Sequence, residues 1–365
     1  MSLNKKTTIA ISIVLVSTFS ALLLLEILLR SFKKDDGWDV TREANIIRNF
    51  EFSYILNGLY PSNTQLVNYR RNEYGLRDDC TDPSEIKILT IGGSTTDQRY
   101  VAFNATYQKI LQNRISAEIG QFGCVTNAGI DGHSTWGHIF AFKNWFPLIP
   151  NLEPDYVVFY IGVNDADFRR GKTPLVGFDV RNAGIKIWLK KLEIVKQLLP
   201  LYRFIRQATL EKYNTPYAWH TPVKYIAEDY AVSDLNNSTL ILTQENVMAF
   251  RSRFKQLLEY VQEMGAIPIC VSQPHRYVRR FDDTVRGVEN ILGIGFSGVD
   301  YDYSLQSLNS VMSDLCEDLF LDLYNHEFSP EHFYDGVHTT DKGSIYIGEL
   351  MGDFFIENNL HNRLR

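Results

Sequence analysis

The chain has 365 residues, of which 45% are hydrophobic and 22% are charged, a composition typical of a globular protein. Its formal net charge of −6 lacks the basic footprint of a nucleic-acid-binding protein, so we expect no nucleic-acid partner. Once an N-terminal segment of about 80 residues is set aside, the length leaves room for one sizeable α/β domain with an insertion.

The N-terminal segment contains an apolar run over residues 9–29, broken only by Ser, Thr and Glu26 and preceded by Lys5 and Lys6. A helix of this length nearly matches a hydrocarbon core of about 30 Å. A cleaved signal peptide is the alternative, but the run is long for one and no clear Ala-x-Ala site follows it. We therefore predict an N-terminal tail at 1–8 and an uncleaved, single-pass transmembrane signal-anchor helix at 9–29. Lysines and arginines flank both ends of the run, so charge leaves its orientation open.

Residues 30–80 mix Tyr, Asn, Arg and Gly without clear periodicity, which is typical of a linker and lead-in arm. Within this arm, the segment 69–77 reads Tyr-Arg-Arg-Asn-Glu-Tyr-Gly-Leu-Arg and is a candidate to pack on the domain that follows.

Predicted strands and helices then alternate along the chain. The strands are expected at 86–91, 122–128, 155–161, 266–272 and 318–323. The helices are expected at 104–119, at 135–146, after an N-cap at Thr243, at 303–317 and from Thr340 onward. This alternation predicts a parallel sheet with right-handed crossovers. We predict a three-layer sandwich around a five-stranded sheet of flavodoxin-like order 2-1-3-4-5.

An insertion at 168–242 separates the third strand from its helix. Within 183–213 there are seven Lys or Arg against two Glu, and apolar residues recur at helical spacing. We interpret this part as a cap helix packed over the domain. The alternatives are an amphipathic surface resting on the membrane and a lid that helps to choose the substrate.

Four short motifs stand at the expected carboxyl ends of the sheet. They are Gly-Gly-Ser at 92–94, Asn-Ala-Gly-Ile-Asp-Gly at 127–132, Gly-Val-Asn-Asp at 162–165 and Asp-Gly-Val-His at 335–338. Each alone is more often an ordinary turn or a surface loop. In an open α/β sheet, however, functional groups gather at the carboxyl ends of the strands. All four in this order indicate a serine hydrolase site, against the alternative of a pseudo-enzyme that keeps the fold without turnover.

The motifs contain every group that acyl transfer to a serine needs. A serine hydroxyl requires a base within hydrogen-bond reach, and we assign Ser94 as nucleophile with His338 as that base. Asp335, three residues before it, would fix the imidazole tautomer and stabilise the imidazolium. The oxyanion requires preorganised donors, for which we assign the backbone N–H groups of Ser94 and Gly132 and the side-chain amide of Asn164.

This set of residues resembles the SGNH (GDSL-type) hydrolase family over about residues 81–360. Ser94 matches the family nucleophile, Gly132 and Asn164 match its oxyanion-hole residues, and Asp335 with His338 matches its Asp-x-x-His pair. The resemblance implies an SGNH hydrolase domain at 81–360.

One position departs from the family pattern, because Gly93 stands where Asp is usual in Gly-Asp-Ser. That Asp is not the triad acid, so catalysis is not put in doubt, although the support of the loop is expected to differ. The run Gly-Gly-Ser-Thr-Thr from Gly92 resembles a membrane-anchored bacterial subgroup associated with cell-surface or exported glycans. This resemblance implies an ordered lead-in arm and a catalytic domain outside the cytoplasm.

The implied reaction is hydrolysis of an acyl ester, such as acetyl, on a glycan or lipid, without a metal or an organic cofactor. The same triad would serve an O-acyltransferase, which is the first alternative. A non-catalytic glycan-binding or assembly protein on the same fold is the second.

The cysteines and one further histidine complete the sequence-based predictions. Cys80 precedes the first strand and Cys124 opens the second, and these strands are neighbours in the expected fold, so a disulfide is predicted in an oxidising compartment. Cys270 is expected as a buried core thiol and Cys316 on a helix. His275 follows the fourth strand and is either a substrate contact or a structural loop histidine.

Overall fold

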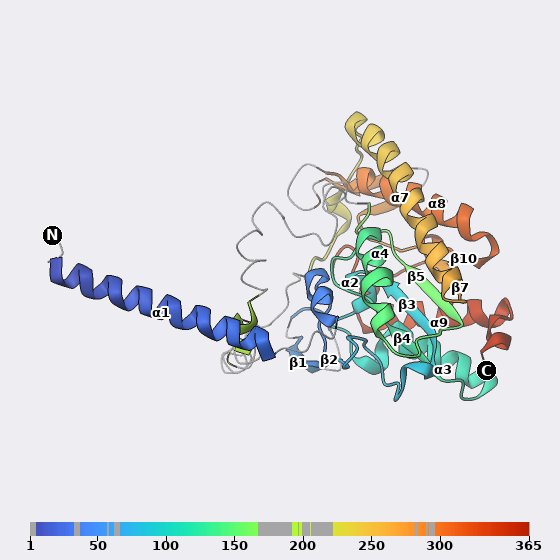
Figure 1. The fold of residues 1–365 in the computed structure, drawn as a ribbon. Coiled ribbons are helices and arrows are strands. Elements are labelled where there is room, and N and C mark those ends of the chain that lie inside the picture. The colour runs from blue at the N-terminus through green and yellow to red at the C-terminus, as the bar shows by residue number, and fades with distance from the viewer. Residues whose placement is uncertain are drawn as a thin grey trace. The chain divides into compact units, whose positions relative to one another are not determined.

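The protein is described by a computed structural model that divides into two compact units (Figure 1). One unit combines Met1–Asp39 with Asp179–Tyr213, and the other combines Val40–Phe178 with Asn214–Arg365. The structure describes residues 5–32, 37–56, 58–61, 66–166, 192–195, 197–198, 205, 222–281, 284–289, 291 and 296–364.

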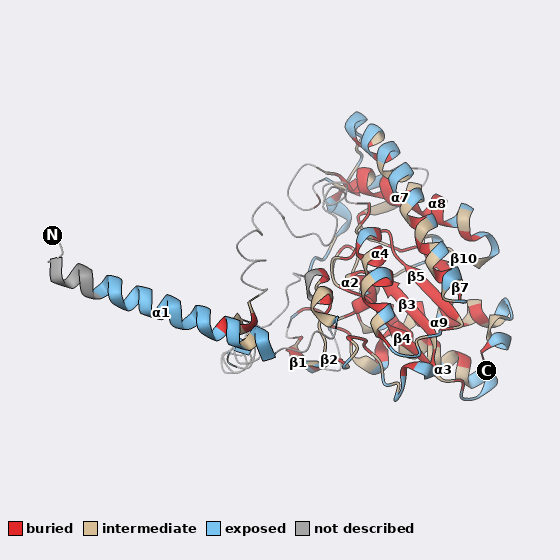
Figure 2. Ribbon diagram, viewed as in Figure 1, coloured by how far each residue is buried: buried red, intermediate tan, exposed pale blue. Residues whose placement is uncertain are grey.

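The first unit is dominated by the helix α1 (Lys5–Phe32). Its stretch Ile11–Phe32 is long and apolar enough to cross a membrane, and the helix is exposed along most of its length (Figure 2). The carboxylate of Glu26 is buried and accepts hydrogen bonds from Arg30 Nε (2.7 Å) and from the backbone N–H groups of Glu193 (3.0 Å) and Ile194 (3.1 Å). The acid inside the apolar run is therefore paired, as acids in apolar surroundings must be.

A five-stranded parallel sheet forms the centre of the second unit. In spatial order its strands are β10 (Phe320–Leu321), β7 (Ile267–Val271), β5 (Tyr156–Tyr160), β3 (Ile86–Gly92) and β4 (Cys124–Asn127). Every neighbouring pair is parallel. Numbered along the chain within this sheet, the order is 2-1-3-4-5, so the predicted flavodoxin-like topology is confirmed.

Helices cover both faces of this sheet and complete a three-layer sandwich (Figure 1). On one face α3 (Tyr107–Ile119) and α9 (Asp341–Glu357) share a core cluster with strand residues of β3, β5 and β7. On the other face, rings from α4 (Thr135–Asn144) and α7 (Asn237–Glu263) contact Phe159 of β5. Helix α8 (Gly298–Cys316) packs against α7. Nearly every residue of β3, β4 and β5 is buried, whereas both residues of the edge strand β10 and the first two of β7 are partly exposed (Figure 2).

Two helices begin earlier than the sequence analysis predicts. The prediction of an N-cap at Thr243 was wrong, because Asn236 caps α7 by accepting from the backbone N–H of Ser238 at 2.9 Å. Thr243 is buried inside that helix. Helix α8 begins at Gly298 because Ser297 and Asp300 form a capping box ahead of it. The predicted cap at Thr340 is confirmed, since its side chain accepts from the N–H of Gly343.

The lead-in arm contains a hairpin that the sequence analysis missed. Strands β1 (Phe50–Ile55) and β2 (Leu66–Arg71) pair antiparallel, so this part of residues 30–80 is an ordered arm whose strands the sequence analysis did not predict. Along β2 exposed and buried residues alternate strictly, but the buried set includes Arg71. An arginine on the inner face hides the period-2 hydrophobic pattern on which strand prediction depends.

A second small sheet contains strands β6 (Tyr230–Ala231), β8 (Val278–Phe281) and β9 (Thr284–Val288), in the spatial order β6-β9-β8. Strand β6 lies in the predicted insertion. The predicted cap helix at 183–213 falls outside the described residues, except for 192–195, 197–198 and 205.

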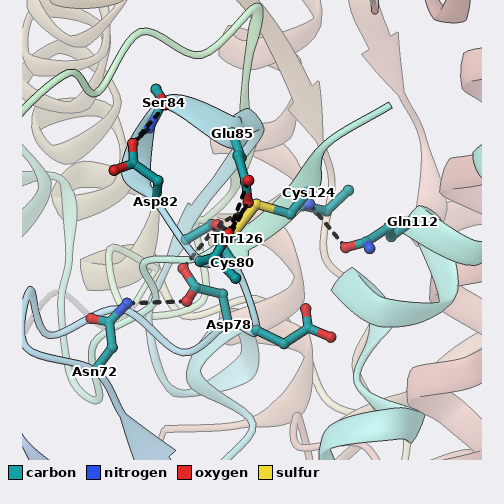
Figure 3. The surroundings of a disulfide bond; sticks show 12 residues. Asn72, Asp78, Cys80, Asp82, Ser84, Glu85, Gln112, Cys124 and Thr126 are labelled. Atoms are coloured by element: carbon teal, nitrogen blue, oxygen red, sulfur yellow. Dashed lines mark hydrogen bonds between the residues drawn. A yellow bond between two sulfur atoms is a disulfide. The ribbon is translucent and has the colours of Figure 1, made fainter. Parts of the chain in front are cut away.

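Two disulfides join the four cysteines. Cys80 pairs with Cys124 across a Cα–Cα distance of 6.0 Å, as predicted, and Figure 3 shows the side chains around this bond. Cys270 pairs with Cys316 at 6.2 Å, so the prediction that Cys270 is a free core thiol was wrong. Cys316 does lie on a helix, as the last residue of α8, and that helix end reaches β7.

Candidate active site

The turn after β3 places Ser94 at the start of the short helix α2 (Ser94–Asp97). The two preceding glycines have no room for a side chain. A Cβ at Gly92 would collide with the side chain of Thr96, and a Cβ at Gly93 would collide with Nδ2 of Asn164. In this chain the Asn164 amide occupies the space that a side chain at position 93 would need.

Ser94, His338 and Asp335 form one continuous hydrogen-bonded relay. His338 Nε2 lies 2.7 Å from Ser94 Oγ, and His338 Nδ1 lies 2.7 Å from Asp335 Oδ2. The second carboxylate oxygen of Asp335 accepts from the backbone N–H groups of His338 (2.7 Å) and Val337 (2.9 Å). An ionised carboxylate can only accept, so Nδ1 carries the proton and Nε2 presents a lone pair to the serine hydroxyl.

The surroundings of the pair keep Asp335 ionised. Burial acts to raise the pKa of Asp335, but the electrostatic interaction with the imidazole of His338 and the hydrogen bonds from His338 and Val337 outweigh it and hold that pKa below its ordinary value. The ring of Tyr334 stacks on the imidazole of His338 with 5.6 Å between centroids and 8° between planes. Tyr334 is itself buried, so the orientation of the imidazole is fixed from its face as well as from Nδ1.

Three hydrogen-bond donors lie on the loops around this relay. Ser94 is the first residue of α2, where backbone N–H groups have no partner within the helix. Gly132 has a φ of +78°, a left-handed conformation that favours glycine. Among the residues that the structure describes, neither the Ser94 N–H nor the Gly132 N–H donates a hydrogen bond to another protein group. The Asn164 amide donates from Nδ2 to the carbonyl of His133 at 2.9 Å, which fixes its orientation beside Gly93.

Gln273 is a supporting residue that the sequence analysis missed. It is buried, donates from Nε2 to Thr95 Oγ1 (2.6 Å) and accepts at Oε1 from the backbone N–H of Val163 (2.9 Å). It thereby ties the end of β7 to the turn of Ser94 and to the loop of Asn164. Its position directly after the predicted strand 266–272 was the available signal, since polar residues at such ends gather at the site.

The structure places His275 in a buried network and not on a substrate-facing surface. Its side chain has no exposed area. Nε2 lies 2.9 Å from Asp302 Oδ1, and Nδ1 accepts from the backbone N–H of Tyr277 at 3.1 Å. Both ring nitrogens are thus engaged within the protein, which favours the structural alternative for this residue.

Within the described part of the chain, no group of three or more His, Cys, Asp or Glu side chains is arranged to hold a metal ion.

Comparisons with known proteins give similarity to solved structures only. No family model matches the chain and no curated protein matches it. An acetyl xylan esterase, AlAXEase, shares 15% identity over 73% of this chain and 98% of its own, with a TM-score of 0.38. A catalytic mutant of the acetylxylan esterase Axe2 from Geobacillus stearothermophilus shares 13% over 79% and 98%, with a TM-score of 0.40. The esterase EstA from Pseudoalteromonas sp. shares 13% over 75% and 98%, also at 0.40.

Proposed function

We propose that this protein is a membrane-anchored serine esterase of the SGNH type that works through an acyl-enzyme. The observation that carries the proposal is the relay from Asp335 through His338 to Ser94, with 2.7 Å at both steps. A serine hydroxyl bonded in this way to an oriented imidazole is an activated nucleophile.

In the first half of the reaction, Ser94 Oγ would attack the ester carbonyl while His338 Nε2 takes its proton. Asp335 stabilises the imidazolium that forms, without itself becoming protonated. The oxyanion would accept hydrogen bonds from the N–H groups of Ser94 and Gly132 and from the Asn164 amide. Each such donor is worth about 3 to 4 kcal/mol in the transition state.

In the second half, the tetrahedral intermediate collapses and His338 returns its proton to the departing alcohol. The acyl group is then esterified to Ser94 Oγ. Water enters, His338 accepts its proton, and hydroxide attacks the acyl carbonyl. The released serine takes the proton back from His338, so the enzyme is regenerated. These side chains and backbone N–H groups supply nucleophile, base and oxyanion donors, and the proposed reaction therefore uses no metal or organic cofactor.

The proposed substrate is a short acyl ester, such as acetyl, on a glycan or lipid outside the cytoplasm. The apolar helix Ile11–Phe32 supports anchoring to a membrane. The disulfides Cys80–Cys124 and Cys270–Cys316 support a domain on the oxidising side, because such bonds persist outside the cytoplasm. Peptide mapping without reductant should recover both cross-linked peptide pairs, and free thiols at these positions would remove this support.

The proposal is tested by treating the full-length protein in detergent with a fluorophosphonate and mapping the labelled peptide. Hydrolysis of p-nitrophenyl acetate and longer esters is measured in parallel, with Ser94→Ala as the control. Labelling at Ser94, together with ester turnover that Ser94→Ala abolishes, is the expected result. Acyl transfer to an added sugar alcohol in preference to water would identify an acyltransferase. A folded protein that is neither labelled nor active would favour the non-catalytic alternative.

A further inference from the structure

The segment 69–77 places two arginines beneath the helix that carries the nucleophile. Arg71 is 3% exposed and Arg77 is 2% exposed. Taking a guanidinium out of water is costly unless its charge and its N–H groups are matched by partners. Such a pair in one short segment therefore calls for a specific explanation, which the contacts of Arg71 supply.

Every nitrogen of the Arg71 guanidinium is engaged. Nε donates to the hydroxyl of Tyr69, and Nη1 donates to the carbonyl of Gly75 at 2.5 Å. Nη2 donates to Asp97 Oδ1 at 2.6 Å and also to the carbonyl of Gly129. One nitrogen thus bridges a side chain on α2 and the backbone of the loop 127–132.

The two bridged residues stand at equal spacing from two of the proposed oxyanion donors. Asp97 lies three residues after Ser94, and Gly129 lies three residues before Gly132. Because Asp97 ends α2 and Gly129 lies in the oxyanion loop, Arg71 connects the two segments that carry these donors.

The two segments also pack backbone against backbone. The side chain of Asn127 donates to the carbonyl of Thr96 (2.7 Å) and accepts from the N–H of Gly129 (2.8 Å). A Cβ at Gly129 would collide with the N–H of Asp97. The Arg71 guanidinium spans this joint between α2 and the loop 127–132, and the close backbone packing depends on residue 129 being a glycine.

The segment 69–77 is held at its far end as well. Asp78 accepts from Asn72 Nδ2 and from Thr126 Oγ1, both at 3.0 Å, and Cys80 is bonded to Cys124 of β4 (Figure 3). The arm therefore provides a fixed base from which Arg71 reaches the joint.

We propose that Arg71 is a positioning residue that sets the spacing between the Ser94 N–H and the Gly132 N–H by bridging Asp97 and Gly129. The inference rests on the proposed function of this site. A displacement of about 1 Å in a catalytic constellation can cost on the order of 10²-fold in rate. The lead-in arm is, on this view, part of the catalytic apparatus and not only a spacer between membrane and domain.

The shape of the guanidinium is as important as its charge. Asp97 is buried, and the charges of Arg71 and Arg99 hold its pKa below the ordinary value against the opposing effect of burial. A lysine at 71 would keep a positive charge near Asp97. An ammonium group on a flexible stem lacks the planar fork that binds several acceptors in fixed directions. Arg71→Lys therefore removes the hydrogen-bonded bridge between Asp97 and Gly129 while keeping the positive charge.

The test compares Arg71→Lys with the matched control Arg77→Lys in the full-length protein. Arg77 is equally buried, but among the described residues its guanidinium donates to the carbonyls of Asp97, Gln98 and Val101, all on the α2 side of the joint. Fluorophosphonate labelling is followed to completion, which counts competent sites, and kcat and KM for p-nitrophenyl acetate are expressed per labelled site. Melting temperatures record stability separately.

We expect Arg71→Lys to label fully at Ser94, with kcat per site lowered roughly 30- to 100-fold, KM within threefold and the acid limb of the pH profile unmoved. Arg77→Lys should lose thermal stability but keep kcat per site within about threefold.

An unchanged kcat per site in Arg71→Lys, with only the melting temperature or the labelled fraction reduced, would overturn the inference while leaving the esterase proposal intact. A wild-type protein that is not labelled at Ser94 would overturn both.

Discussion

The described part of the domain contains two His–Asp pairs of nearly equal length, and their surroundings suit them to different roles. His338 Nδ1 lies 2.7 Å from Asp335 Oδ2, and His275 Nε2 lies 2.9 Å from Asp302 Oδ1. The remaining nitrogen of His338 meets the Ser94 hydroxyl, whereas that of His275 accepts from the backbone N–H of Tyr277. The second ring nitrogen of His338 can therefore accept the mobile proton of the Ser94 hydroxyl, whereas that of His275 is occupied by a backbone N–H group whose proton does not transfer.

The hydrogen-bond partners of the two carboxylates differ as well. Asp335 takes its other hydrogen bonds from backbone N–H groups of its own loop. Asp302 also accepts from Tyr324 Oη (2.5 Å) and from Gln306 Nε2 (2.6 Å). The imidazole of His338 is 15% exposed and that of His275 is fully buried. A His–Asp pair is therefore suited to catalysis when its second ring nitrogen and a path from solvent are kept open, and otherwise it acts as a cross-link.

The cross-linking pair also supports the other one. Tyr277, which donates to His275, packs against Gly336 so closely that a Cβ there would collide with its ring. The N–H of Arg276 donates to the carbonyl of Gly336 at 2.8 Å. Since Gly336 lies between Asp335 and His338, the network of His275 supports the loop on which the proposed base stands.

The largest expected effect that separates the pairs comes from removing each histidine. His338→Ala should lower kcat by roughly 10⁴- to 10⁶-fold, because both the base and its relay are lost. His275→Ala should lower the melting temperature by several degrees, with kcat per labelled site reduced by no more than about tenfold. Ester hydrolysis, site titration and thermal melts measure these quantities. An equal loss of kcat in a fully folded His275→Ala would show that the comparison is wrong.

Replacing each aspartate by asparagine tests the same contrast without removing a ring. Asp335→Asn should lower kcat by about 10⁴-fold, since the amide can donate to Nδ1 and would favour the wrong tautomer. Asp302→Asn should leave kcat within about tenfold and mainly reduce stability, because only one of the two histidines passes a proton. If Asp335→Asn retained nearly full kcat, Asp335 would not be the orienting carboxylate.

The part of the site that could be predicted from sequence follows from local motifs and sheet topology. Ser94, Asn164 and His338 each follow a strand or its loop, and a parallel sheet brings those carboxyl ends together. The structure accordingly places Ser94 and His338 within hydrogen-bond distance although 244 residues separate them. The alternation of strand and helix predicts a parallel sheet, and the flavodoxin-like strand order chosen for that sheet is confirmed.

The partners of the supporting residues could not be predicted, because each depends on a pairing across the fold. Gln273 and the Cys270–Cys316 bond require knowing which helix end and which loop reach β7. Arg71 lies on the inner face of a hairpin strand, where an arginine contradicts the hydropathy signal. Only the placement of Asp97 and Gly129 reveals why a charge belongs there.

Removing one assigned oxyanion donor is expected to lower kcat less than removing the base. No oxyanion donor is assigned in the network around His275. Asn164→Ala should lower kcat by roughly 10²- to 10³-fold with little change in KM, since the amide would act on the charge that develops in the transition state. Steady-state kinetics on p-nitrophenyl acetate measure both constants. A change confined to KM would remove Asn164 from the oxyanion hole, and Asn144→Ala, on the far end of α4, serves as a control amide.

The smallest effect concerns stability against pH. Burial acts to raise the pKa of Asp302, but hydrogen bonds from His275, Tyr324 and Gln306 outweigh it and lower the pKa below its ordinary value. A carboxyl whose pKa is lowered on folding stabilises the folded state above the ordinary value of about 4, and this stabilisation is lost as the pH falls through the lowered value. Each unit of lowering is worth about 1.4 kcal/mol. Urea unfolding between pH 7 and pH 3 should therefore show a smaller loss of unfolding free energy on acidification in Asp302→Asn than in the wild type.

Because Asp335 has a lowered pKa for similar reasons, Asp335→Asn should likewise reduce the dependence of unfolding free energy on pH. The two pairs are thus expected to behave alike in acid stability while differing by orders of magnitude in kcat, and an unchanged acid slope in both variants would contradict the ionised state assigned to these carboxylates.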